Sequence, residues 1–267
     1  MDERTRRELG GVFGSVADVY DRNRPGYPDP AVEWLLGSAP LDVLELGAGT
    51  GKLTRSLVTP GHRVTASDPA GAMLSHVSRH APSARLVRTR AEQLPFRAQS
   101  FDAVVVAQAF HWFDHEIALP EIARVLRPAG TLALVWNMRD ESVPWVHRLT
   151  TILGEEPFGS EIEEDVYRAS ASGLFGAPES KRFRFWQHLD RPGLLGLVAS
   201  RSYVAAMDTA ARDRLLARVG ALYDEYERGP DGMRLPYLAH CFRTRKAADA
   251  AGETEPPGGG DLLFDFR

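Results

Sequence analysis

Three glycines, Gly47, Gly49 and Gly51, directly follow an apolar run that contains one acid, Glu45. Without a Cβ, the backbone at these positions can turn sharply and let a ligand contact main-chain atoms. Ligands of open α/β sheets bind at such bends beyond the strand ends. The pattern predicts a binding loop with a carboxylate beside it, which suits a cationic ligand. The alternative is a tight turn that binds nothing.

Two well-known nucleotide-binding loops fit this spacing poorly. A dinucleotide loop that starts at Gly47 needs glycine or alanine at position 52, where this chain has Lys52. A phosphate loop needs glycine at position 46 and a hydroxyl at position 53, where the chain has Leu46 and Leu53. The loop is therefore expected to hold a ligand other than a pyrophosphate.

A second acid, Asp68, ends the next apolar run, 17 residues after Gly51. At this distance an acid can accept hydrogen bonds from ribose hydroxyls. An aspartate before Pro69 and Ala70 would also serve as the N-cap of a following helix. The two roles are compatible, and we expect Asp68 to bind a ribose.

Residues 43–53 resemble motif I of class I methyltransferases, an acid followed by three alternating glycines. The resemblance implies S-adenosylmethionine as cofactor, with its methionine part held by the loop, including Ala48, and with Glu45 near its amino group. This compound has an ammonium and a sulfonium but no phosphate, which agrees with an acid beside the loop. Over residues 13–245 the chain resembles the type 11 methyltransferases grouped with trans-aconitate methyltransferase, and more distantly ubiquinone and menaquinone C-methyltransferases.

Residues 90–96, RAEQLPF, resemble the family segment that binds adenine. The family has an acid or asparagine where this chain has Arg90. The resemblance therefore assigns adenine contacts to the backbone of Ala91 and to Glu92.

Ala107 and Gln108 end a buried apolar run and are expected to contact the cofactor, because ligands of open sheets lie at that edge. Methyl transfer is expected at the same place. His111 follows and could act as a general base or orient an acceptor oxygen. It could equally be a structural histidine packed between Phe110 and Trp112. Trp112 is also a candidate for lining the acceptor pocket.

Further candidates lie outside these segments. Tyr20, Arg24 and Tyr27 resemble family positions that close over the cofactor, although a solvated turn is the alternative. Arg139 and Arg201 could bind an acceptor carboxylate through two hydrogen bonds each, or be ordinary surface cations.

The arrangement of apolar runs predicts a Rossmann-like class I methyltransferase fold of the α/β class, with a seven-stranded, mostly parallel sheet, helices on both faces and a helical cap. The expected strands are 41–46, 63–67, 84–89, 101–108, 131–136, 181–191 and 234–245. The expected helices are 5–20, 51–59, 69–80, one whose regular part begins near Pro120, 193–207 and 210–227.

We expect one methyltransferase domain over residues 1–245 and a disordered tail over 246–267. The domain is expected to comprise a lid helix and turn (1–30), a cofactor-binding core (31–139), a helical cap and insertion (140–230, including strand 181–191) and a last strand (234–245).

Composition limits the partners and the compartment. The 32 basic and 36 acidic residues give a net charge of -4 without a basic stripe, so a small-molecule acceptor is expected rather than nucleic acid. Cys241 is the only cysteine, and no run of apolar residues reaches membrane-spanning length, which favours a cytoplasmic protein with no membrane partner. His111 and His115 lack a third ligand set by spacing, so no metal is expected. The expected state is a monomer or homodimer.

These features predict a methyltransferase that passes the methyl group of S-adenosylmethionine to a small molecule, at a carboxylate or hydroxyl, by in-line displacement. One alternative is a catalytically inactive cofactor-binding protein or subunit. Another is an NAD(P)-dependent oxidoreductase, against which Lys52 argues.

Overall fold

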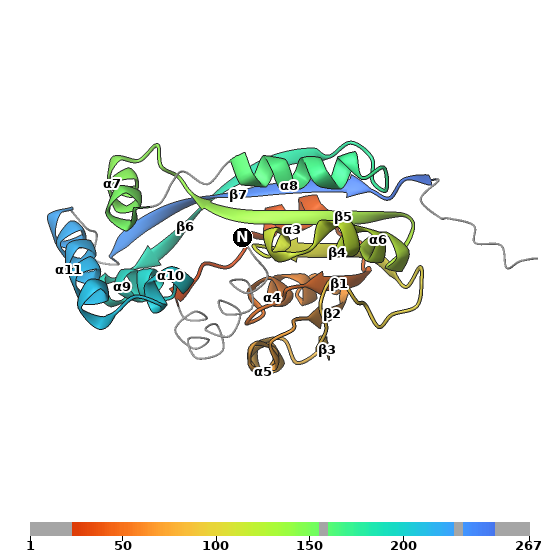
Figure 1. The fold of residues 1–267 in the computed structure, drawn as a ribbon, viewed down its shortest axis with the longest axis horizontal. Coiled ribbons are helices and arrows are strands. Elements are labelled where there is room, and N and C mark those ends of the chain that lie inside the picture. Colours follow the sequence, from red (N-terminus) through yellow and green to blue (C-terminus); the bar gives the residue numbers. More distant parts are fainter. Residues whose placement is uncertain (1–22, 155–159, 227–231, 249–267) are drawn as a thin grey trace, which may run out of the picture.

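The computed structural model describes residues 23–154, 160–226 and 232–248. The expected N-terminal helix with Tyr20, and most of the expected tail, lie outside these residues. The described chain is organised around one seven-stranded sheet (Figure 1).

The sheet has the strand order β3-β2-β1-β4-β5-β7-β6. Every neighbouring pair is parallel except the two pairs made by β7, which is antiparallel to β5 and β6. This confirms the expected mostly parallel, Rossmann-like sheet. The strands are β1 (Asp42–Leu46), β2 (Arg63–Ser67), β3 (Arg85–Val87), β4 (Phe101–Ala107), β5 (Leu126–Arg139), β6 (Glu179–Leu189) and β7 (Met233–Arg245).

Helices cover both faces of the sheet. On one face α3 (Asp29–Leu36) and α4 (Lys52–Val58) pack against the central strands, and α5 (Gly71–His80) packs beside α4. On the other face lie α6 (His115–Val125) and α8 (Ser160–Ala171). The remaining helical elements are η1 (Phe110–Trp112), α7 (Pro144–Leu153), α9 (Arg191–Ala199), α10 (Ser202–Ala205) and α11 (Thr209–Glu225).

Strand β1 shows how the sheet sorts its side chains. Val43 packs with α3 and α4, whereas Leu44 and Leu46 pack with α6 on the opposite face. Successive strand residues point to opposite faces, so Glu45 must lie on the α4 face. The acid of the glycine loop is therefore directed into the protein.

Strand β5 extends past the end of β4. The last residue of β4, Ala107, pairs with Val135, whereas residues 136–139 pair with β7 alone. Beside this extension, α7, α9 and α11 pack with residues of β6 and β7 in a second apolar core, which we call the cap (Figure 1). Its buried residues include Leu149, Leu197, Leu222 and Leu235. Helix α8 instead packs on the sheet, so segment 140–230 divides between the cap and one sheet face.

Some element bounds differ from the sequence expectations. Helix α6 begins at His115, well before Pro120, because the Asp114 carboxylate accepts a hydrogen bond from the Glu116 backbone N–H and caps the helix. The expected helix 193–207 is interrupted between α9 and α10. Helix α3 was not predicted.

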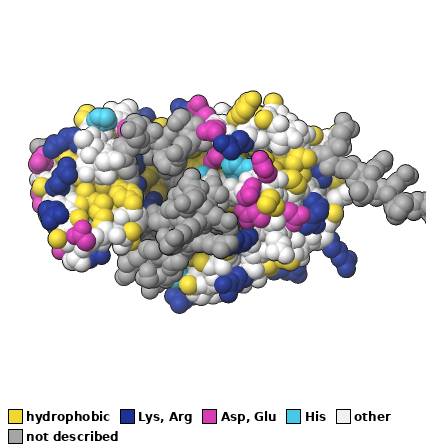
Figure 2. Space-filling model, viewed as in Figure 1, with side chains coloured by type: hydrophobic (Ala, Val, Ile, Leu, Met, Phe, Trp, Pro, Cys, Tyr) yellow, Lys and Arg dark blue, Asp and Glu magenta, His cyan; other side chains and the backbone are white. Residues whose placement is uncertain are grey.

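On the face seen in Figure 2, hydrophobic side chains gather over the cap at the left, while charged side chains of both signs are interspersed elsewhere. Among the helices of the described residues, none has the length and apolar character that crossing a membrane requires.

The turn that opens β5 places Ala129 at a φ of 57°, in the left-handed region, whereas Gly130 has no such φ. A Cβ in this region costs about 1 kcal/mol. We therefore expect Ala129→Gly to raise the free energy of unfolding by about 1 kcal/mol, measured by denaturant titration. The neighbouring Gly130→Ala should destabilise the protein, because its Cβ would lie 2.9 Å from the Arg127 carbonyl oxygen. Equal stability of Ala129→Gly and the wild type would contradict the assigned strain.

Candidate active site

The glycine loop turns the chain from β1 into α4. All three glycines have positive φ: Gly47 68°, Gly49 55° and Gly51 88°. The turn is closed by a hydrogen bond of 2.9 Å from the Gly51 N–H to the Ala48 carbonyl. The Ala48 N–H donates to the carbonyl of Ser67, at the end of β2, over 2.9 Å. The adjacent parallel strands β1 and β2 therefore fix the loop between them.

The three glycines are required for different reasons. A Cβ on Gly47 would lie 2.6 Å from the Ala109 Cβ, and one on Gly51 would lie 3.2 Å from Val77. A Cβ on Gly49 would meet nothing within 4 Å. Gly47 and Gly51 thus allow close packing of the protein on itself. The bare side of Gly49 faces open space, where a ligand can approach the backbone.

Asp68 holds the loop from the end of β2. One carboxylate oxygen accepts a hydrogen bond of 2.9 Å from the Gly49 N–H, and the other accepts one of 2.8 Å from the Ala70 N–H at the start of α5. Burial raises the pKa of the Asp68 carboxyl, and these two hydrogen bonds oppose the rise. Helix α5 begins at Gly71 with Ala70 as its N-cap, so the expectation that Asp68 caps a helix starting at Pro69 was wrong. Asp68 instead holds the loop through Gly49, which the sequence did not suggest.

Glu45 is a buried acid that forms no ion pair with any described residue. It is 1% exposed, and its Oε2 accepts a hydrogen bond of 2.6 Å from the Thr54 hydroxyl on α4. Burial raises the pKa of the Glu45 carboxyl to about 8; the Thr54 hydrogen bond opposes this rise, and the nearby Asp68 charge adds to it. A cation at the loop would favour the charged carboxylate. Thr54 was missed in the sequence, although it lies on the first turns of the helix after the loop.

The end of β4 has an unusual backbone. Gln108 adopts a φ of 56°, which costs energy for a residue with a side chain. Its N–H donates to the Val135 carbonyl over 3.0 Å, and its Nε2 donates to the Asn137 carbonyl over 3.2 Å. The structure thereby ties Ala107 and Gln108 to the neighbouring strand β5. Asn137 was also missed, although it is a polar residue that ends an apolar run.

The short helix η1 carries His111 next to this strand end. Phe110 is fully buried, and its carbonyl lies 3.0 Å from Nε2 of His115, whose ring stacks on the Phe110 ring. The His111 ring is half-buried, with its centroid 4.9 Å from that of Trp112. His111 is thus held on a fixed segment beside the sheet edge. Its role as a base and the alternative structural role stay predictions.

Other predicted site residues make protein contacts of their own. Glu92 accepts a hydrogen bond of 2.9 Å from the Asp114 N–H before α6, and Ala91 packs in the core beneath α6. The Arg24 Nε donates to the Ser200 hydroxyl over 3.2 Å, at the end of α9. Adenine contacts of Ala91 and Glu92, and a cofactor contact of Arg24, stay predictions.

The two candidate acceptor-binding arginines lie in different places. Arg139 ends β5 and donates through Nη2 to the Thr150 hydroxyl on α7 over 3.1 Å. Thr150 in turn donates to Glu141 over 3.0 Å. Arg201 is half-buried and follows α9 in the cap. Arg139 therefore joins the end of the sheet to the cap.

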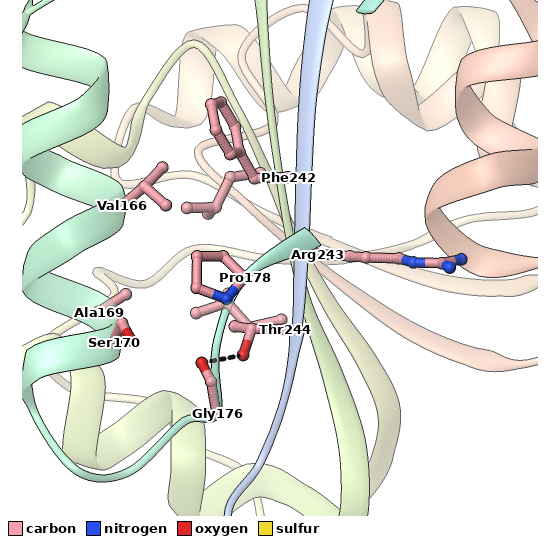
Figure 3. A pocket seen from close by; sticks show the side chains of 10 residues that line it. Val166, Ala169, Ser170, Gly176, Pro178, Phe242, Arg243 and Thr244 are labelled. Atoms are coloured by element: carbon pink, nitrogen blue, oxygen red, sulfur yellow. Dashed lines mark hydrogen bonds between the residues drawn. The ribbon is translucent and has the colours of Figure 1, made fainter. Parts of the chain in front are cut away.

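A small hollow between α8 and the sheet is not this site. Val166 on α8 faces Phe242 and Pro178 across it, and the Thr244 hydroxyl donates to the Gly176 carbonyl over 2.7 Å at its edge (Figure 3). The lining is almost entirely apolar and lies away from the glycine loop. Few polar groups are present there to orient a ligand. Among the described side chains, no group of three His, Cys, Asp or Glu residues is arranged to hold a metal ion.

Comparisons with known proteins point to one family. Residues 44–134 match the model of a methyltransferase domain. An uncharacterized methyltransferase of Mycobacterium bovis is 40% identical over 245 residues, which cover 91% of this chain and 99% of that protein. A malonyl-[acyl-carrier protein] O-methyltransferase of Methylococcus capsulatus is 36% identical over 143 residues, 49% of this chain and 52% of that protein. One similar solved structure, from Anaeromyxobacter dehalogenans, is provisionally described as a type II methyltransferase. It has a TM-score of 0.55 and 27% sequence identity, and the match covers 84% of this chain and 97% of that one.

The buried acid predicts a pH dependence of stability. The pKa of Glu45 is raised in the folded protein, so its protonated form stabilises the fold fully below about pH 4.5, and this contribution is lost as the pH rises to about 8. We expect the free energy of unfolding to fall across this window by up to about 1.4 kcal/mol per pH unit from this group. Glu45→Gln should flatten the profile, because a neutral amide keeps the acceptor for Thr54.

Denaturant titrations from pH 5.5 to pH 8.5 of the ligand-free protein measure this difference. Glu33→Gln, at an exposed acid on α3, is the matched control and should retain the wild-type slope. Parallel profiles of Glu45→Gln and the wild type would show that Glu45 is ionised in the folded protein.

Proposed function

This chain belongs to the class I, S-adenosylmethionine-dependent methyltransferases, and from that premise we propose that it methylates a small organic acid or alcohol at oxygen. When bound, S-adenosylmethionine supplies an electrophilic methyl group on a positively charged sulfur. The main support for the cofactor site is that the backbone at Gly49 faces open space while a buried acid, Glu45, lies on the preceding strand.

The loop residues would hold the methionine part of the cofactor, because Gly49 has no side chain on its open side. Glu45, ionised by the approach of an ammonium group, would favour its binding. Asp68 would accept hydrogen bonds from ribose hydroxyls through lone pairs that the Gly49 and Ala70 N–H groups leave free. These roles match the polar groups that the loop presents.

The ends of β4 and β5 would receive the acceptor. Gln108 is fixed there by two hydrogen bonds to β5, and a rigid edge favours alignment of the two reactants. A carboxylate acceptor is already nucleophilic and needs no base, whereas a hydroxyl would pass its proton to His111. Trp112 would line the apolar side of this pocket.

An acidic acceptor is favoured by Arg139. It ends the extension of β5 on the same sheet face as Asn137, and it contacts α7 of the cap. A guanidinium there can bind a carboxylate through two hydrogen bonds. The O-methyltransferase relative, which acts on a malonyl group according to its name, supports transfer to oxygen. Arg201 in the cap would be a second anion-binding residue.

We also propose action in the cytoplasm as a monomer or homodimer. The single cysteine, Cys241, is buried, and burial raises its pKa to about 12, so its thiol is poorly reactive.

The clamp on the loop predicts a loss of cofactor affinity. Asp68→Ala removes both acceptors for the Gly49 and Ala70 N–H groups, and we expect Kd for S-adenosylmethionine to rise about 100-fold by calorimetric titration. Asp68→Asn keeps one acceptor oxygen, and we expect its Kd for S-adenosylmethionine to rise by only about 10-fold. Thermal melts check that both variants fold. An unchanged affinity of Asp68→Ala would remove Asp68 from the ribose site.

The acceptor class is tested by transfer of radiolabelled methyl groups to a panel of carboxylic acids, alcohols and amines. A methyl ester is identified because its label is released by alkali, and an ether keeps it. For a carboxylate acceptor, His111→Ala should leave kcat within about twofold, whereas for a hydroxyl it should lower kcat by about 100-fold or more. Arg139→Ala should raise KM for an acid by about 10-fold, with the exposed Arg79→Ala as control. Transfer to nitrogen or carbon alone would refute the proposal.

A further inference from the structure

Residues 23–27, which we call the strap, run between the cap and the sheet. The Gln187 Nε2 on β6 donates to the Asn23 carbonyl over 2.7 Å. The Asn137 Nδ2 on β5 donates to the Gly26 carbonyl over 3.0 Å. Two side-chain amides from different strands thus hold the backbone of the strap at both of its ends.

The strap also sits in a notch of α9. A Cβ on Gly196 would lie 2.6 Å from the Asn23 Nδ2, so a larger residue there would force the Asn23 side chain to shift. Arg24 contacts Ser200 at the end of the same helix. At its other end, Gly26 lies near the Arg55 guanidinium of α4, the helix that follows the glycine loop. The strap therefore spans from the cap to the cofactor edge.

Asn137 connects the strap to the methyl-transfer edge. Its side chain donates to Gly26, and its own carbonyl accepts the Nε2 hydrogen bond of Gln108. A displacement of the strap at Gly26 would act directly on Asn137, and through it on the end of β4.

The side-chain amides of Asn137 and Gln187, which hold the strap, lower the stability of the fold. The Asn137 Oδ1 and the Gln187 Oε1 are buried and have no hydrogen-bond partner in the described protein. A buried polar atom without a partner is destabilising. Apolar residues at these positions would avoid that cost but would lose the N–H donors to the strap, so the contacts point to a need for the strap in this place.

We propose that Asn137 and Gln187 are positioning residues that hold the strap across the cofactor edge, and that this placement strengthens the binding of S-adenosylmethionine. The bound strap excludes water from the edge and keeps Gln108 in place beside the cofactor. This effect concerns the binding of the cofactor alone, so its test does not depend on which acceptor the protein methylates.

The test uses three variants that loosen the strap from three elements: Asn137→Ala, Gln187→Ala and Gly196→Ala. We expect each to raise Kd for S-adenosylmethionine by about fivefold or more in calorimetric titration. When the folded protein is treated with trypsin, each variant should also be cleaved faster at the peptide bond before Asn23. The cleavage products are identified by mass spectrometry. Gly196→Ala is the sharpest variant, because alanine favours the helix and the melting temperature should not fall. Lys181→Ala, on the same face of β6 as Gln187, is the control and should behave as the wild type.

Faster cleavage with an unchanged Kd in all three variants would overturn the coupling to the cofactor. Unchanged cleavage and Kd would overturn the anchoring itself. A rise in Kd for Asn137→Ala alone would restrict the effect to its contact with Gln108 and refute the role of the strap.

Discussion

The hydrogen bond from the Gly49 N–H to Asp68 fixes the bend between β1 and α4, and the cofactor edge depends on that bend. The bend needs three glycines with positive φ, and two of them leave no room for a Cβ. Since β1 and β2 are parallel neighbours, the end of β2 arrives beside the loop and brings Asp68 with it. One strand pairing thus supplies both the open backbone and the acid that holds it.

The extension of β5 positions the residues that we propose for the acceptor site. Beyond the end of β4, the strand continues beside β7, whose Met233, Leu235 and Tyr237 pack in the apolar core of the cap. Arg139 bonds to Thr150 of the cap, and Asn137 bonds to the strap, so both polar contacts come from this extension. A change in the cap can therefore alter the proposed acceptor site while the glycine loop keeps its shape.

Several buried polar groups cost the fold stability. Burial in the apolar interior raises the pKa of the Glu45 carboxyl, and a cation at the loop would lower it again. The amide oxygens of Asn137 and Gln187 are buried and have no hydrogen-bond partner among the described residues, while their N–H groups hold the strap. These groups lie around one edge of the sheet, which is the arrangement expected of a site that binds a charged ligand.

The sequence alone determined the strand and helix pattern of the core, the glycine loop and the acids beside it, because periodicity and glycine requirements are local. It missed α3 and the true start of α6, whose Asp114 cap outweighed Pro120. Only the tertiary structure decided that Arg24 meets Ser200 and that Gln187 holds Asn23, 164 residues away in the chain. The periodicity of the local sequence indicates whether a residue is buried. Which distant residue it contacts depends on how every element between the two packs.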